Sequence, residues 1–476
     1  MMTNLYVNTQ AGFRGVSKIS TQLEQNFNLK SVSFSCLRQW VLRLSYGILQ
    51  MGVEKREDWI YIIDFSISLG KQKCLLILGT TIDKLNTFGY ELKHENLCVL
   101  DIFVAEYFDS SIVYERLTCV KQKTGSPYQI VCDNGNDLTK GVELFCESNE
   151  NTVRSYDVSH MIGICIKHSL EKDSQWLDLQ ADLRSLTQQV KQTDVSFLRP
   201  IALSKKARWL NIQNEIIWLE NIYAYEAKND FSLISTGFKI SNVEEVFDEF
   251  KIFFNGKKAK KRFKKAISHT IFQTEEEFER FLIDNKINCK QNIQTINAGK
   301  ARFVEKFNIL DKHKKYFLEL QELNEMTKNI KINIKEKGLS AETLEAIEPK
   351  QINTNWVKDI CVDIKNRLVI ENSKFKKLND LENQLDKKPT LCCSDIIESI
   401  FGKFKMKINQ SVGGIYSSVL SITLFCTHLT TELITEILIK IKISDVDKWF
   451  VKMTGRSNLA KRREAFSKKH KVKNKT

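Results

Sequence analysis

The sequence contains few prolines, 4 among 476 residues, so little in it prevents long helices. It also lacks an uncharged apolar run long enough to span a membrane, and the nearest run, at 411–430, includes His428 and many serines and threonines. The first residues, Met1–Leu5, lack the charged and apolar regions of a signal peptide. We therefore expect a soluble, cytoplasmic protein that has no membrane partner.

The 12 cysteines lack the spacing of a zinc site. Cys392 and Cys393 are adjacent, and the sequence has no CxxC or HxxxH pair that could complete a site. Other cysteines, such as Cys74 and Cys165, stand inside apolar runs. These positions are typical of reduced, mostly buried thiols in a cytosolic protein.

Positive charge is abundant. The chain has 72 Lys and Arg against 58 Asp and Glu, which gives a net charge of +14 and a pI of about 9.0. Such an excess favours a polyanionic partner, and nucleic acid explains it more commonly than a membrane surface does. With 42% hydrophobic and 27% charged residues, the chain is globular and long enough for about two to four domains.

Residues 1–54 predict a pair of basic helices. We place one helix at 17–27 with Ser17 as its N-cap, and a second at 36–45 with Ser35 as its N-cap. The inner face of the second helix consists of Leu37, Trp40, Val41 and Leu44. Its outer face presents Arg38, Gln39 and Arg43. The pattern fits a DNA-binding helix-turn-helix, and the alternative is a helical pair that packs on the next domain.

Residues 55–165 predict a sheet. Apolar runs at 59–69, 74–80, 96–105, 128–132 and 152–157 indicate strands, and 109–121 indicates a helix. Asp64 interrupts the first run, where a buried carboxylate must be paired, hydrogen-bonded or bound to a metal unless it only holds a turn at the strand end. Asp133 follows the fourth run and precedes a glycine-containing turn and a helix, a position where ligands of α/β sheets usually bind.

Residues 166–390 predict mostly helices, including 243–254 and 275–285. The cluster at 256–265 is either a solvated helix face or a phosphate-binding face. Arg208 and Trp209 together offer a cation and a stacking ring to a distorted DNA base, although Trp209 also suits a helix core.

Residues 391–455 predict a return to the first domain, and 456–476 a disordered basic arm. Ser394 can cap a helix whose apolar face runs from Ile396 to Phe404 and which carries Glu398. Lys403 and Lys405 follow Glu398 by about one and two turns, so they are candidates for phosphate contacts or ordinary solvated lysines.

Asp64, Asp133 and Glu398 form the one constellation that suggests chemistry. Two strand aspartates and a helix glutamate that meet at one edge of a sheet would hold two Mg²⁺ ions by oxygen ligands, with Mn²⁺ as a substitute. Without a cation, carboxylates so close together would raise each other's pKa.

The segments 59–64, 73–79, 132–138 and 397–405 resemble the signature segments of bacterial insertion-sequence transposases of the DDE type. The resemblance implies an α/β fold, an RNase H-like mixed sheet with flanking helices, in which Asp64, Asp133 and Glu398 are the catalytic triad. The long gap before Glu398 departs from compact members and resembles those with an inserted domain, here predicted helical. The implied chemistry is metal-dependent cleavage at transposon ends followed by strand transfer into target DNA. The implied partners are double-stranded DNA and a second copy of the chain in a homodimer.

Several alternatives stay open at this point. Asp137 competes with Asp133 but better suits an N-cap of the following helix. Asp157 and His160 would support the triad or contact the scissile phosphate, although a structural histidine at a helix start is the simpler interpretation. The whole chain could also be a decayed transposase that only binds DNA, or an RNase H-like nuclease without strand transfer. A purely helical scaffold would leave the aspartate-bearing strands unexplained.

Overall fold

The computed structural model describes residues 1–69, 72–192, 198–200, 212–227, 303–348, 352–379, 390–408 and 417–454. The chain divides into two compact units. Unit 1 comprises Met1–Met161, Lys331–Ile347 and Lys365–Thr476, and unit 2 comprises Ile162–Ile330 and Glu348–Ile364. The stretches 331–347 and 365–390 were predicted to be part of the helical segment, but as far as they are described they belong to unit 1.

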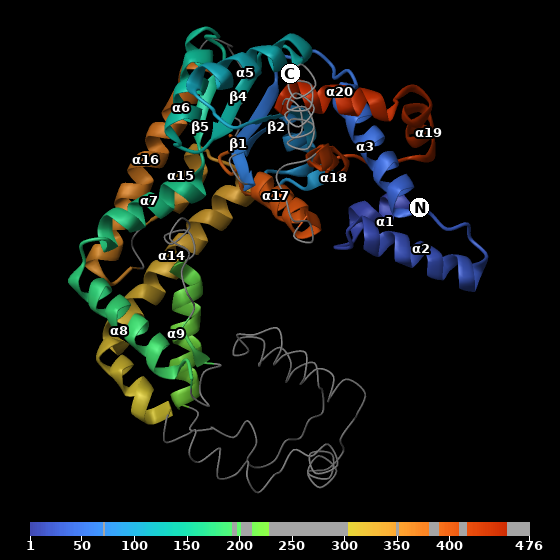
Figure 1. The fold of residues 1–476 in the computed structure, drawn as a ribbon. Coiled ribbons are helices and arrows are strands. Elements are labelled where there is room, and N and C mark those ends of the chain that lie inside the picture. Colours follow the sequence, from blue (N-terminus) through green and yellow to red (C-terminus); the bar gives the residue numbers. More distant parts are fainter. Residues whose placement is uncertain are drawn as a thin grey trace, which may run out of the picture. The chain divides into compact units, whose positions relative to one another are not determined.

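Unit 1 is built on a five-stranded mixed sheet with the order β3-β2-β1-β4-β5. The strands are β1 (Trp59–Leu69), β2 (Gln72–Thr81), β3 (Cys98–Ala105), β4 (Pro127–Cys132) and β5 (Val153–Tyr156). β1 pairs antiparallel with β2, and β2 pairs antiparallel with β3, whereas β1–β4 and β4–β5 are parallel. The predicted strands and the mixed α/β class are confirmed (Figure 1).

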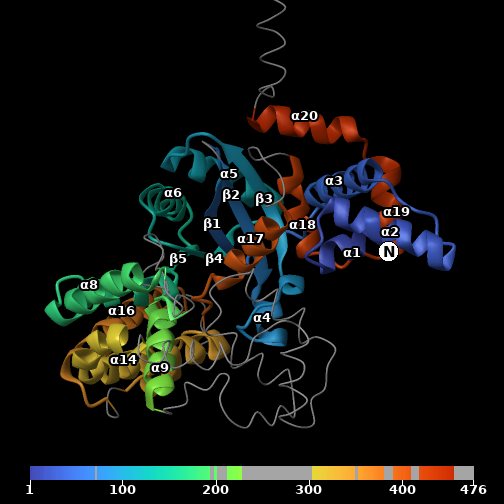
Figure 2. The same ribbon diagram turned by 60° about the horizontal axis from the view of Figure 1, so that its bottom comes forward.

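The two faces of the sheet bury different helices because the side chains of β1 alternate. Trp59, Tyr61 and Ile63 join the core beneath α5 (Ser110–Thr124) and α6 (Asn136–Glu147). Ile60 and Ile62 point to the other face and pack with α3 (Phe34–Gln50), α17 (Asp395–Ile408) and α18 (Ile422–Phe425). Figure 2 shows α6 on one side of the sheet, and α3 and α18 on the other.

The N-terminal helices begin earlier than predicted. α1 covers Met2–Asn8, and α2 covers Phe13–Phe27 with Gly12 at its N-cap. Ser17 therefore lies inside α2, where its hydroxyl donates to the Val32 carbonyl over 2.9 Å. α3 is capped by Ser33 instead of Ser35, because the Ser33 hydroxyl accepts the Cys36 amide.

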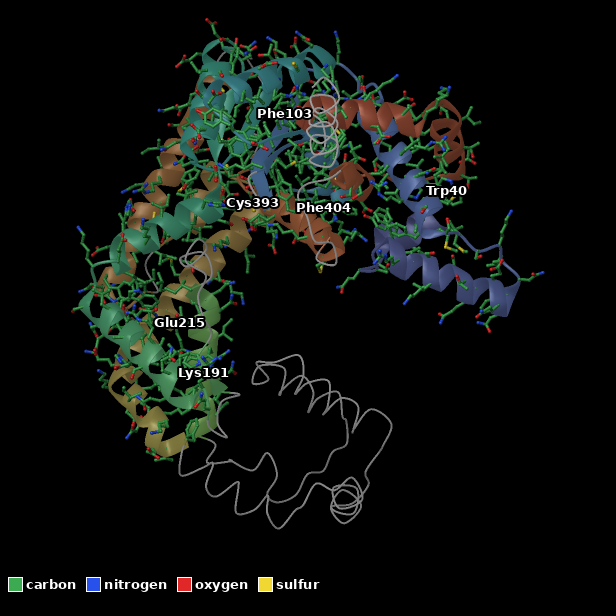
Figure 3. The ribbon with its side chains drawn as sticks, viewed as in Figure 1. Trp40, Phe103, Lys191, Glu215, Cys393 and Phe404 are labelled. Atoms are coloured by element: carbon green, nitrogen blue, oxygen red, sulfur yellow. The ribbon has the colours of Figure 1, made fainter. Side chains whose placement is uncertain are left out.

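The predicted inner face of α3 is confirmed in large part. Leu37, Val41 and Leu44 are fully buried, and Trp40, labelled in Figure 3, is half-buried. α3 packs against α18, α19 (Thr431–Lys440) and α20 (Ile443–Thr454). The apolar segment after α17 contains η5 (Ser417–Ser421), α18 and α19, with a break at 426–430.

Shorter elements complete unit 1: α4 (Ile82–Phe88), η1 (His94–Asn96) and α15 (Ala341–Ala346). α7 (Val158–Leu170), α14 (Lys314–Lys337) and α16 (Asn355–Asn379) each contribute residues to both units.

The described part of unit 2 is helical. Besides its parts of α7, α14 and α16, it contains α8 (Ser174–Val190), α9 (Ile212–Ala227) and η3 (Asn308–His313). Its core includes Trp176, Leu186, Ile216, Leu320 and Val357. The predicted helices at 243–254 and 275–285 and the basic clusters at 256–265 and 456–476 lie outside the described residues. None of the helices in the described ranges is long and apolar enough to cross a membrane.

Candidate active site on the central strands

The strand register brings Asp64 and Asp133 together. β1 and β4 are parallel neighbours in which Ile62 lies opposite Val131. Ile62 and Val131 both face the core beneath α17. Asp64 and Asp133 follow these two residues by two positions in the sequence. Because every second side chain of an extended segment points to the same face, Asp64 and Asp133 lie side by side on that face.

A tight turn fixes Asp133 directly after β4. Its Oδ1 accepts the Gly135 amide over 2.9 Å, and its backbone carbonyl accepts the Thr139 hydroxyl over 3.4 Å. A Cβ atom on Gly135 would approach Oδ1 of Asp133 to 3.1 Å, so the turn favours glycine there. Gly135 is also the N-cap of α6, so the prediction that Asp137 caps this helix is wrong, and Asp137 is an exposed residue of its first turn.

Glu398 reaches the same site from α17, which packs on β1. Ile397, Ile400 and Phe401 bury one side of this helix against the sheet, while the Glu398 side chain stays 60% exposed. Oε1 of Glu398 lies 3.7 Å from Nε2 of His160 at the start of α7. Phe404, also on the buried side, and Cys393, just before the helix, are labelled in Figure 3.

The charges of these groups are coupled. The pKa of Asp64 is raised to about 7, chiefly by burial and also by the negative charges of Asp133 and Glu398, while His160 opposes the increase. The pKa of His160 is raised to about 9, chiefly by Glu398. At neutral pH the His160 side chain is therefore cationic, and Asp64 is near the midpoint of its ionisation.

Asp157 connects the starts of two helices. Its fully buried carboxylate accepts the His160 amide over 2.8 Å, the Ser394 amide over 2.6 Å and the Ser394 hydroxyl over 2.7 Å. Burial raises the pKa of Asp157, and the bonds from Ser394 and His160 oppose this. α17 begins after Ser394 as predicted, but the Ser394 hydroxyl donates to Asp157.

The donor set of the triad fits a hard divalent cation. Three carboxylates supply oxygen ligands, and a bound cation would offset the repulsion that raises the pKa of Asp64. The ligand oxygens of Asp64, Asp133 and Glu398 do not form one of the groups that lie within 4.8 Å of one another in the described part of the chain. A cation held by these carboxylates would need further oxygen ligands, such as water or a substrate phosphate, as is usual for Mg²⁺.

Two other groups do lie within 4.8 Å, and protein donors already satisfy them. In unit 2, the group consists of Asp178, Asp182 and His313. Nζ of Lys312 lies 2.8 Å from a carboxylate oxygen of each of the two aspartates. In unit 1, Asp157 and Asp395 form a group with Cys393, but Asp157 holds the bonds just described and Asp395 accepts the Ser159 hydroxyl over 3.1 Å.

The candidate DNA-binding side chains differ in their surroundings. Gln39 and Lys405 are exposed, as predicted, and Arg38 is half-buried. Arg43 does not point outward, because its guanidinium donates to the Ile441 carbonyl over 2.6 Å and to the Leu438 carbonyl at the end of α19.

Lys403 also departs from the prediction. Its Nζ lies 5.0 Å from the centre of the Phe425 ring, and burial lowers its pKa. It lies about 140° around α17 from Glu398, whereas Lys405 returns to nearly the same face, because successive residues turn by about 100°. Arg208 and Trp209 lie outside the described residues.

Sequence reasoning missed Arg154. This side chain on β5 contacts the turn that carries Asp133, and donates to the Asp133 carbonyl over 3.4 Å. The only signal was an arginine within a short apolar strand next to the predicted site.

No family model matches the sequence, and no curated protein matches it. Among solved structures, the chain is similar to the Drosophila P element transposase strand transfer complex. The match has 13% sequence identity and a TM-score of 0.36, and it covers 91% of this chain and 92% of that chain. The bacterial insertion-sequence family expected from the sequence is thus matched by no family model.

Proposed function

We propose that unit 1 is an RNase H-like catalytic domain that transfers phosphoryl groups of DNA with the help of divalent metal ions. One observation carries the proposal: Asp64 within β1 and Asp133 directly after β4 lie side by side, each two residues beyond the last pair of these parallel strands. The negative charge of Glu398 also contributes to the raised pKa of Asp64. The strand order, three antiparallel strands followed by two parallel ones, supports the RNase H-like assignment.

In this proposal, Asp64, Asp133 and Glu398 hold two Mg²⁺ ions, or Mn²⁺ in their place. Bound ions would activate an attacking oxygen and stabilise the leaving oxygen. Asp64 and Asp133 occupy fixed backbone positions, so they define where the scissile phosphate must lie. Glu398 projects from the exposed side of α17, and His160 beside it contributes positive charge near that phosphate.

The substrate in this proposal is double-stranded DNA, and the reaction is cleavage at transposon ends followed by strand transfer. The net charge of +14 favours such a polyanion. Lys405, exposed on the face of α17 that carries Glu398, is the best-placed described candidate for a phosphate contact. A homodimer would hold both DNA ends, and unit 2, which falls within the predicted helical segment 166–390 apart from its first residues, would be an inserted helical domain.

The test is nicking of a supercoiled plasmid that carries the DNA flanking the protein's own gene, with Mg²⁺, with Mn²⁺ and with a chelator. We expect metal-dependent cutting by the wild type and a loss of at least about 100-fold in Asp64→Asn, Asp133→Asn and Glu398→Gln. Asp137→Asn is the matched control, because it changes an exposed aspartate in the same turn. Equal cutting by all variants would refute the proposal, and DNA binding without cutting under every metal would favour a decayed, DNA-binding protein.

A further inference from the structure

The Arg154 side chain forms hydrogen bonds with the turn that carries Asp133. The side chain starts from β5, where Arg154 lies opposite Ile130 of β4, and it is only 13% exposed. Its Nε donates to Cys132 Sγ over 3.3 Å, and its Nη2 donates to the Asp133 carbonyl over 3.4 Å. The guanidinium thus bonds to the last residue of β4 and to Asp133 itself.

The same guanidinium also reaches the start of α6. Nη2 donates to the Thr139 hydroxyl over 3.2 Å and to the side-chain oxygen of Asn134. Nη1 forms an ion pair of 3.6 Å with Glu143, whose side chain is 51% exposed. The guanidinium of Arg154 therefore contacts three consecutive parts of the chain, which are the end of β4, the loop that carries Asp133, and the N-terminal part of α6.

A lysine could not make these contacts together. Arginine presents five donors in a fixed plane, whereas a lysine ammonium is a single point charge on a flexible stem. The Asp133 carboxylate is held from the other side by the Gly135 amide. Arg154 therefore holds the backbone of Asp133, and the Gly135 amide holds its carboxylate.

We propose that Arg154 is a positioning residue for Asp133, which sets the distance between Asp133 and Asp64 and hence the metal affinity of the site. This inference rests on the proposed function, since it assigns Asp133 a role in metal binding. Groups that orient a metal ligand typically change metal affinity or activity by about 10-fold to 100-fold when they are replaced.

The experiment compares Arg154→Lys with Arg116→Lys in the full chain. Arg116 is a matched control, because it is an equally enclosed arginine, 17% exposed, whose partner Asp101 lies on β3 at the opposite edge of the sheet. The readouts are Mn²⁺ binding measured by calorimetric titration, the Mn²⁺ concentration that gives half-maximal nicking, and the thermal midpoint. We expect Arg154→Lys to raise the Mn²⁺ requirement by about 10-fold to 100-fold, with partial rescue of the rate at saturating Mn²⁺. Arg116→Lys should change the thermal midpoint and leave the Mn²⁺ requirement as in the wild type.

An unchanged Mn²⁺ requirement in Arg154→Lys, or an equal rise in Arg116→Lys, would overturn the inference while the wild type still nicks DNA. A wild type that neither binds Mn²⁺ nor nicks DNA would overturn the proposed function and this inference with it. If Arg154→Lys does not fold, Glu143→Gln decides instead, because it removes one exposed partner of Arg154. It should raise the Mn²⁺ requirement about twofold to fivefold, and no change would overturn the inference.

Discussion

The link between Asp157 and Ser394 should hold the Glu398 helix in place. Positions 157 and 394 are far apart in the sequence, yet one buried carboxylate accepts both the amide and the hydroxyl of Ser394. Asp157→Ala would leave these two donors and the His160 amide without their acceptor. Ser394→Ala removes only the hydroxyl bond and keeps the backbone bond.

The expected magnitudes follow from the number of bonds. A buried donor left unpaired costs about 1–3 kcal/mol. The Ser394 hydroxyl can rotate to another partner, so the two amides that stay unpaired predict a loss of about 2–6 kcal/mol for Asp157→Ala. A hydrogen bond to a charged group contributes about 1.5–3 kcal/mol, which is the loss expected for Ser394→Ala alone. In the Asp157→Ala background, Ser394→Ala should cost about 1–2 kcal/mol less, because its bond is already gone.

The assay is hydrogen exchange by mass spectrometry on peptides that cover α17, which reports the free energy of local opening. All four proteins of the cycle are compared: wild type, both single variants and the double variant. Additive effects of the two substitutions, or a loss below about 1 kcal/mol for Asp157→Ala, would refute the claim that this bond holds α17.

Two further predictions concern Asp64 and Arg43. In the metal-free protein the pKa of Asp64 lies near 7, above its usual 3.8, so the folded state loses stability as pH rises from about 4 to 7 and the carboxylate ionises. Asp64→Asn should therefore raise the thermal midpoint at pH 8 in the presence of a chelator, with the gain fading below pH 4, and a lower midpoint at pH 8 would contradict this. Arg43→Ala should increase hydrogen exchange in α19 by removing donors to the Ile441 and Leu438 carbonyls, at a cost of about 1.5–3 kcal/mol. Gln39→Ala, on the exposed side of α3, is its control, and equal exchange in the two variants would show that Arg43 does not cap α19.

Local patterns were sufficient for the sheet and for the meeting of Asp64 with Asp133. The apolar runs of β1, β2 and β4 end at turn residues, Asp64 interrupts the first run, and Asp133 directly follows the run of β4. Because β1 and β4 pair in parallel, the two aspartates lie at the same level of the sheet. Glu398 could be placed because the apolar spacing of α17 fixes which of its sides is buried.

Side-chain partners distant in sequence could not be predicted. Ser17 and Ser394 look like N-caps, but the hydroxyl of Ser17 donates to Val32 and that of Ser394 donates to Asp157. Arg43 looks like an outward cation, yet its acceptors lie nearly four hundred residues away in α19. Arg154 carries no sequence signal, because its partners gather only when β5 pairs with β4. In each case, tertiary contacts decided between roles that the local sequence allows equally.

The central claim, that Asp133 binds a catalytic metal, is tested most directly by Asp133→Cys. A thiolate is a softer ligand than a carboxylate and binds Mg²⁺ poorly, whereas Mn²⁺ accepts it more readily. We predict that Asp133→Cys does not nick DNA with Mg²⁺ and recovers nicking with Mn²⁺, while Asp137→Cys in the same turn nicks with Mg²⁺ like the wild type. Nicking by Asp133→Cys with Mg²⁺ at the wild-type rate would contradict the proposed site.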